Sequence, residues 1–209
     1  MRRCVIIGGA EIRNYEFVRG YLLPEDFCIF CDCGLEHEAG LGVCADLVVG
    51  DFDSHELPVD ISPEKLIVLP REKDDTDTMY AIREGIRRGF EEFLLIGVIG
   101  ARLDHTLVNV YGLLKLAMAG KFAKILDDYS EMEIILPGDV KRVSGEFRYF
   151  SLVSISGIAR GVNITGAKFA LEDGEIRSEY QFATSNEVLP AHVAEITLRE
   201  GSLLLIRVV

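Results

Sequence analysis

The sequence has no surplus of basic residues, no membrane-length apolar run and no low-complexity segment or repeat. Its 209 residues include 22 Lys and Arg against 34 Asp and Glu, a formal net charge of −12. A nucleic-acid surface needs a basic face to neutralise phosphates, so this balance argues against nucleic acid as a partner. A small charged ligand that arrives with a metal ion fits the composition better.

The longest apolar stretches, such as residues 93–101, are too short and too interrupted by glycine to span a bilayer. At the start of the chain, Glu11 and Arg13 appear before the apolar core of a signal peptide is complete. We therefore expect a cytoplasmic protein with no membrane partner.

The five cysteines are an odd number, and the spacing of Cys28, Cys31, Cys33 and Cys44 superficially suggests a zinc or iron–sulfur site. In an extended strand Cys31 and Cys33 face one side and Cys28 the other, so a closed tetrahedral site is geometrically awkward. We expect buried, reduced thiols, because free cysteine is among the most buried residue types.

Apolar runs and helix-like segments alternate through the first part of the chain. Continuous apolar runs predict buried strands, and apolar positions at helical spacing predict helices. Strands are predicted at 4–7, 27–31, 47–49, 65–69, 93–96 and 123–126, and helices at 35–41, 78–88 and 106–118. For the second helix, Asp75 or Thr76 is the expected N-cap and Gly89 the stop. This alternation predicts a mainly parallel, layered α/β sheet.

The pattern changes near Asp128, after which short β-like segments are separated by glycines and no convincing helix appears. Strands are predicted at 132–136, 147–155, 162–165 and 193–198. Residues 199–201 separate two strand-like runs and predict a hairpin. We therefore expect an α/β domain over residues 1–129 and an all-β domain over residues 130–209.

Carboxylates follow the predicted strands where those strands run out: Asp32, Asp51, Asp53, the cluster at 74–77 and Asp104. In an open α/β sheet, ligands bind beyond the carboxyl ends of the strands, so these acids can converge. Two carboxylates about 4 Å apart repel by roughly 4 kcal/mol at an effective dielectric near 20. Convergence therefore calls for a cation, and oxygen-only ligands favour Mg²⁺ that bridges to substrate phosphates.

Each acidic motif also has a purely structural explanation. Asp51 and Asp53 share one side of an extended chain, but they could equally belong to an acidic turn. Residues 74–77 suit a helix N-terminus, which favours acids through capping and the macrodipole. Arg102 and the following helix start could meet a phosphate, whereas Asp104 could merely cap that helix. The recurrence of acids at successive strand ends favours the functional interpretation.

In combination these motifs resemble the thiamine pyrophosphokinase family across nearly the whole chain. The resemblance is carried by Asp32-Cys33-Gly34, Gly50-Asp51-Phe52-Asp53-Ser54, Lys73-Asp74-Asp75-Thr76-Asp77, Gly100-Ala101-Arg102-Leu103-Asp104-His105 and Thr184-Ser185-Asn186-Glu187. It implies an N-terminal α/β domain, a C-terminal β-sandwich and a homodimer with active sites at the subunit interface. The implied reaction moves pyrophosphate from ATP to the thiamine hydroxyl and releases AMP.

The resemblance also implies roles for the two domains and for individual residues. Residues 1–129 would bind nucleotide and metal and carry catalysis, and residues 130–209 would bind thiamine and dimerise. The implied Mg²⁺ ligands and catalytic acids are Asp51, Asp53 and Asp77, with Asp104 as a further catalytic acid; Asp32, Lys73, Thr76 and Arg102 would lie at ATP and its phosphates, and Ser185 and Asn186 at thiamine. Cys33 stands where the family usually has glycine, and without tryptophan the stacking candidates are Phe182 and Tyr180.

The residue inventory suits this chemistry, because pyrophosphoryl transfer needs metal and cationic groups that offset phosphate charge and align the hydroxyl. Two alternatives stay open. A non-catalytic nucleotide- or thiamine-binding sensor would keep the acids but have a blocked substrate pocket. A Mg²⁺-dependent nucleotide phosphohydrolase would use the same carboxylates to activate water.

Overall fold

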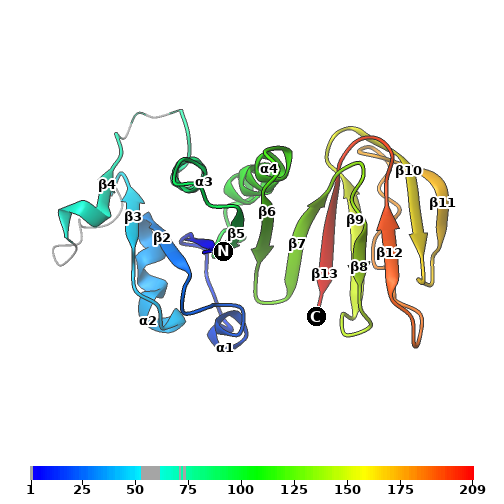
Figure 1. Ribbon diagram of the computed structural model, residues 1–209, viewed down its shortest axis with the longest axis horizontal. Coiled ribbons are helices and arrows are strands. Elements are labelled where there is room, and N and C mark those ends of the chain that lie inside the picture. The colour runs from blue at the N-terminus through cyan, green and yellow to red at the C-terminus, as the bar shows by residue number, and fades with distance from the viewer. Residues whose placement is uncertain (1, 53–61, 71, 73) are drawn as a thin grey trace. The chain divides into compact units, whose positions relative to one another are not determined.

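The computed structural model describes residues 2–52, 62–70, 72 and 74–209 (Figure 1). The chain divides into two compact units, Met1–Asp128 and Tyr129–Val209. The first unit mixes strands and helices, and the second consists of strands and their connections.

The first unit contains a parallel sheet with helices between its strands. Its strands are β1 (Cys4–Ile7), β2 (Phe27–Cys31), β3 (Leu47–Gly50), β4 (Leu66–Val68), β5 (Glu92–Ile96) and β6 (Phe122–Leu126), in the sheet order β4-β3-β2-β1-β5-β6. All five neighbouring pairs are parallel. The α-helices are α1 (Tyr15–Arg19), α2 (Glu38–Leu41), α3 (Asp77–Arg87) and α4 (Leu103–Met118), and the 3₁₀ helices are η1 (Asp32–His37) and η2 (Pro63–Lys65). The predicted α/β sheet is confirmed.

Strands β1, β2 and β3 are buried along their whole length. On one face, Val5 and Phe30 belong to an apolar cluster that includes Val18 of α1 and Leu41 of α2. On the other face α3 packs against β1, β2 and β3, and it lies beside α4 (Figure 1). Because helices cover both faces, these strands have continuous apolar sequences rather than alternating ones.

The helix boundaries follow local chemistry. Thr76 caps α3, since its hydroxyl accepts a hydrogen bond from the Met79 N–H at 3.2 Å, and Gly89 follows the helix at φ 83°. Helix α4 begins at Leu103, three residues before its predicted start, and Asp104 lies inside its first turn rather than at its N-cap. The interpretation of Asp104 as a helix cap was therefore wrong. Within the described ranges, none of the helices is long and apolar enough to cross a membrane.

The second unit is a sandwich of two antiparallel sheets. Its strands are β7 (Ser130–Ile135), β8 (Lys141–Val143), β9 (Tyr149–Ser154), β10 (Ile158–Thr165), β11 (Leu171–Arg177), β12 (Ala194–Thr197) and β13 (Leu203–Val208). One sheet has the order β7-β13-β9 and the other β11-β10-β12-β8. Side chains of both sheets, among them Leu152, Leu205, Val162 and Ile196, form one buried core. The predicted all-β architecture is confirmed.

The hairpin predicted at residues 199–201 was wrong. Strand β12 pairs with β10 and β8, whereas β13 belongs to the other sheet, so this turn carries the chain from one sheet to the other. The turn residues pair with β10 instead: the Arg160 N–H donates to the Glu200 carbonyl at 2.9 Å, and the Arg199 N–H donates to the Arg160 carbonyl at 3.0 Å.

Candidate active site

The parallel register brings the carboxyl ends of four strands to one edge of the sheet. Cys31 of β2 lies opposite Val49 of β3, and Ile7 of β1 lies between Phe30 and Ile96 on its two neighbours. The segments that follow β1, β2, β3 and β5 therefore leave the sheet next to one another. This edge is where an open α/β sheet binds ligands.

Asp32 and Asp51 stand at neighbouring positions of this edge. Asp32 directly follows β2 with φ 46°, and Asp51 directly follows Gly50 at the end of β3. A Cβ at Gly50 would lie 3.1 Å from the Asp32 Cα, tighter than most Cβ contacts, so glycine permits this close approach of the two strand ends. Phe52 has φ 51°, so the chain is no longer extended after Asp51. The alternation of an extended strand therefore ends at Asp51.

Asp77 approaches the same edge from the first turn of α3. The neighbouring Thr78 makes a side-chain hydrogen bond with the buried Cys31 thiol, the last residue of β2. Burial raises the pKa of Cys31 well above its ordinary value, and nearby negative groups, among them Asp77 and Asp32, raise it further. Burial, Asp32 and, more weakly, Asp77 also raise the pKa of Cys33. Two acids that are 45 positions apart in the sequence thus act on the same pair of thiols.

The predicted magnesium ligands fit a hard cation in their chemistry, because they are carboxylate oxygens. Asp51 and Asp77 belong to the part of the chain that the structure describes, whereas Asp53 and Lys73 lie outside it. Within that described part, no three His, Cys, Asp or Glu side chains form a cluster suited to a metal ion. The three-carboxylate site stays a prediction.

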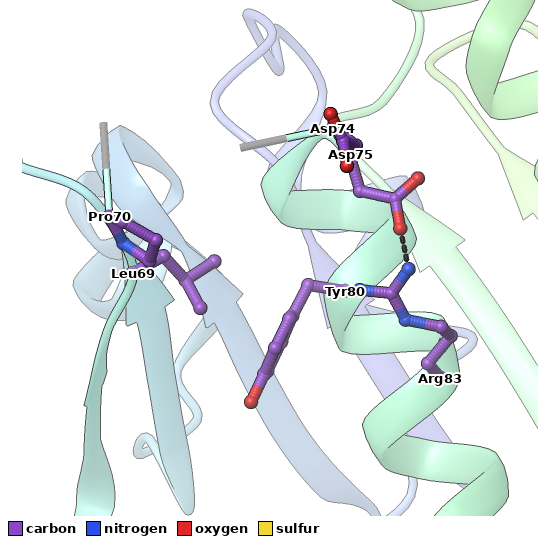
Figure 2. A pocket seen from close by; sticks show the side chains of 6 residues that line it. All are labelled: Leu69, Pro70, Asp74, Asp75, Tyr80 and Arg83. Carbon is purple, nitrogen blue, oxygen red and sulfur yellow. Dashed lines mark ion pairs between the residues drawn. The ribbon is translucent and has the colours of Figure 1, made fainter. Parts of the chain in front are cut away.

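An open pocket of about 270 Å³ lies beside the start of α3 (Figure 2). Leu69 and Pro70 form one wall, and Tyr80 and Arg83 of α3 form another. Asp74 and Asp75 also line it, and Asp75 forms an ion pair with Arg83. Within the acidic cluster at 74–77, Asp75 therefore pairs with Arg83, whereas Asp77 lies near the carboxyl ends of the strands.

Arg102 and Asp104 are joined to each other. The Arg102 Nε and Nη2 donate to the two Asp104 carboxylate oxygens at 3.0 and 2.6 Å, and both side chains are exposed, at 70% and 64%. Arg102 holds the pKa of Asp104 well below its usual range. This bidentate pair presents a cation and an anion together on the surface at the start of α4.

Two polar residues that sequence analysis did not select hold the β5–α4 connection. The Thr106 hydroxyl accepts from the Gly100 N–H at 3.1 Å, and the buried Asn109 amide donates to the Val98 carbonyl at 2.8 Å. The sequence could have indicated Asn109, because it is a polar residue within an apolar helix and a buried amide needs a hydrogen-bond partner.

Ser185 and Asn186 differ sharply in their surroundings. Ser185 is exposed at φ 55°, and its N–H donates to the Ser151 hydroxyl at 3.0 Å. Asn186 is 3% exposed: its amide oxygen accepts from the Phe169 N–H at 3.0 Å and its amide nitrogen donates to the Phe169 carbonyl at 2.8 Å. Its backbone also exchanges both hydrogen bonds with Phe150. In this structure Asn186 fixes the backbone beside Ser185.

The two aromatic stacking candidates lie together. The rings of Tyr180 and Phe182 have centroids 5.6 Å apart, and the side chains are 67% and 45% exposed. The exposed pair lies a few residues before Ser185 in the chain, so both sets of predicted thiamine residues belong to one segment of the sandwich.

The expectation of buried thiols holds for three cysteines. Cys4, Cys28 and Cys31 are buried and Cys33 is half-buried, but Cys44 is exposed, so the expectation was wrong there. Cys44 lies in the loop between α2 and β3 rather than in a strand.

A parallel α/β sheet with carboxylates beyond the carboxyl ends of its strands, joined in one chain to a β-sandwich, defines the architectural class of this protein. The family model described as "Thiamin pyrophosphokinase, catalytic domain" matches residues 18–125. The model described as "Thiamin pyrophosphokinase, vitamin B1 binding domain" matches residues 139–203. The chain belongs to the thiamin pyrophosphokinase family of enzymes.

Relatives from other organisms agree with this assignment. The thiamine pyrophosphokinase of Bacillus subtilis (strain 168) is 24% identical over 213 aligned residues, covering 99% of each chain. The crystal structure of a B. subtilis thiamine pyrophosphokinase has a TM-score of 0.83 at 22% identity and 99% coverage of both chains. The Geobacillus thermodenitrificans thiamin pyrophosphokinase structure has a TM-score of 0.81 at 27% identity, covering 99% of this chain and 97% of its own. These structures share the α/β and β-sandwich fold.

Proposed function

We propose that this chain transfers the pyrophosphoryl group of ATP to the hydroxyl of thiamine, giving thiamine diphosphate and AMP. The observation that carries the proposal is that Asp32 and Asp51 directly follow neighbouring strands, and that Asp77 acts with Asp32 on Cys31 at the end of one of those strands. The match of residues 139–203 to a vitamin B1 binding domain supports thiamine as the acceptor.

In the proposed reaction the thiamine hydroxyl oxygen attacks the β-phosphorus of ATP. The bond between that phosphorus and the oxygen bridging to the α-phosphate breaks, and AMP leaves. The hydroxyl proton passes to a carboxylate, such as that of Asp104, which acts as the general base. Asp51, Asp53 and Asp77 would hold Mg²⁺, which supplies positive charge against the phosphates. Lys73, Arg102 and the N-terminus of α3 at Thr76 would meet the phosphates, and Asp32 the nucleotide.

We assign nucleotide and metal binding to residues 1–129 and thiamine binding and dimerisation to residues 130–209. In the sandwich, Ser185 would contact thiamine, while Asn186 would act by holding the segment in place. The exposed rings of Phe182 and Tyr180 are the surfaces available there for stacking on thiamine. The expected cytoplasmic location stays a prediction.

The deciding experiment incubates the protein with ATP, Mg²⁺ and thiamine and identifies the products by mass spectrometry. We expect equal amounts of AMP and thiamine diphosphate, and no product without the metal. AMP without thiamine diphosphate would indicate the phosphohydrolase instead. Nucleotide binding without any product would indicate the sensor.

We also propose that a homodimer assembles each site from the α/β unit of one subunit and the sandwich of the other. The test mixes Asp77→Asn subunits with Ser185→Arg subunits, whose added positive charge opposes the thiamine cation. Each variant alone should be inactive, and heterodimers should regain part of the activity. Continued inactivity in verified heterodimers would contradict shared sites.

A further inference from the structure

The short helix η1, which begins with Asp32, lies against the connection from β1 to α1. We call residues 8–14 of this connection the glycine loop. Cys33 packs its sulfur directly over Gly9, and Gly34 meets the backbone of Ile7 and Gly8, so a Cβ at Gly9 or Gly34 would overlap these atoms. Helix η1 therefore contains Asp32, a candidate nucleotide-binding residue, and also contacts Gly8 and Gly9, the first glycines after β1.

His37, at the far end of η1, is 9% exposed and contacts both the glycine loop and Tyr15, the first residue of α1. Its Nε2 lies 3.0 Å from the Ala10 carbonyl oxygen, and its Nδ1 lies 2.7 Å from the Tyr15 hydroxyl. A carbonyl oxygen can only accept, so Nε2 carries the proton and donates. In the neutral imidazole Nδ1 is then the acceptor, and the Tyr15 hydroxyl donates to it.

The sheet fixes other points of the glycine loop. The Gly8 N–H donates to the Ile96 carbonyl at 2.9 Å, and the Ala10 N–H donates to the Gly97 carbonyl at 2.8 Å. At the far end, the Arg13 and Asn14 N–H groups donate to the Asp128 carboxylate, each at 2.9 Å. These contacts hold the loop to β5 and β6, whereas the His37 contacts hold it to the element that begins with Asp32.

We propose that His37 is a positioning residue that fixes the glycine loop relative to Asp32. It thereby shapes the part of the site that would bind the nucleotide. The inference rests on the proposed function, because it takes the sheet edge as the place where ATP binds. The hydrogen bonds that His37 makes with the Ala10 carbonyl and the Tyr15 hydroxyl transmit the position of η1 to the loop. Losing them lets the loop shift relative to Asp32 while the rest of the sheet is unchanged.

The test measures MgATP binding to the full chain by isothermal titration calorimetry, together with kcat and KM for both substrates. His37→Phe keeps the ring but removes both hydrogen bonds, and we expect it to raise the Kd and KM for ATP about tenfold, the size of one to two net hydrogen bonds. The KM for thiamine should change less than about twofold. His37→Gln retains a donor for Ala10 and should restore most of the affinity.

Two further variants separate positioning from general destabilisation. Tyr15→Phe removes only the hydroxyl and should raise the Kd for ATP by about two- to fourfold. His192, an exposed histidine of the sandwich, also lies at a backbone carbonyl, 2.8 Å from that of Pro190, so His192→Phe is the matched control and should leave the Kd unchanged. If His37→Phe does not fold, His37→Asn replaces it, because its shorter amide does not reach Ala10.

A wild-type Kd in His37→Phe or His37→Asn would overturn the inference, as would a His37→Gln variant that binds ATP as weakly as either of them. Wild-type protein that binds no MgATP would overturn it together with the nucleotide role of this edge. Wild-type protein that binds MgATP without making thiamine diphosphate would overturn the proposed reaction alone, and the variants would still decide the role of His37.

Discussion

Acidic side chains are arranged differently in the two units of the chain. In the α/β unit, Asp32 and Asp77 come from separate segments and both raise the pKa of the buried Cys31. In the sandwich, acids face cations, as in the ion pairs Arg160–Glu175, Arg142–Glu195, Lys168–Glu187 and Arg199–Asp173. Acids that lie near one another disfavour each other's charged form, whereas a neighbouring base favours it.

The α/β unit also contains matched acids, but they lie elsewhere. Arg3 and Asp26 precede β1 and β2, at the amino ends of the strands, and their side chains are 2.7 Å apart. Glu84 lies in the third turn of α3 and accepts hydrogen bonds from Arg87 and Arg88. The position of an acid along its strand or helix, rather than the domain to which it belongs, separates a structural role from a candidate site.

The largest expected effect comes from Asp77→Asn, which removes a charge at the sheet edge while nearly preserving shape. Turnover of ATP and thiamine should fall by about a thousandfold or more, about 4 kcal/mol in the barrier, while thermal unfolding changes little. Asp173→Asn makes the same change at an exposed ion pair of the sandwich and should leave turnover intact. Near-normal rates for Asp77→Asn at limiting Mg²⁺ would remove Asp77 from the metal site.

A second substitution tests the buried ion pairs of the sandwich. Arg207 is 6% exposed, lies 3.7 Å from Glu131 and also pairs with Glu133. Burial alone would raise the pKa of Glu133, but Arg207 and Lys141 outweigh it, so this pKa lies below its ordinary value. Arg207→Met leaves these buried acids without their main cation and should cost about 3–5 kcal/mol of the free energy of unfolding.

The control for Arg207→Met is Arg160→Met at a surface pair, where the loss should stay below about 1 kcal/mol. Both variants are compared by urea unfolding at neutral pH. Equal losses would contradict the distinction between buried and surface pairs.

The smallest expected effect concerns Glu84, whose pKa is lowered to about 2 by the Arg87 hydrogen bond first and by Arg88 next, against an ordinary value of 4.5. Because the folded pKa lies below the unfolded one, the ionised carboxylate stabilises the fold above pH 4.5, and this contribution is lost as pH falls from 4.5 towards 2. The stability difference between wild type and Glu84→Gln should therefore shrink across that range in urea unfolding. A difference that stays constant with pH would contradict the assignment.

Much of the fold could be predicted because some elements are encoded locally. The run Cys-Val-Ile-Ile gave β1 at its observed bounds, and Thr76 and Gly89 bracketed α3 as expected. Strand β11, Leu171–Arg177, was not predicted, because four of its seven residues are charged; it is the edge strand next to β10. The link at 199–201 looked like a hairpin because a short glycine turn between apolar runs does not specify which sheet each run joins.

Some features of the candidate site are likewise encoded locally, and others depend on the tertiary structure. The sequence by itself placed Asp32, Asp51 and Asp77 at strand and helix ends. Hydrophobic periodicity and the residues that end strands and begin helices are local properties of the chain. Only the tertiary structure turned Asn186 inward to hold Phe169 and brought His37 to Ala10 and Tyr15. The packing of sheets and helices decides which residues far apart in sequence become hydrogen-bond partners. The spacing of residue types along the chain does not reveal these partners.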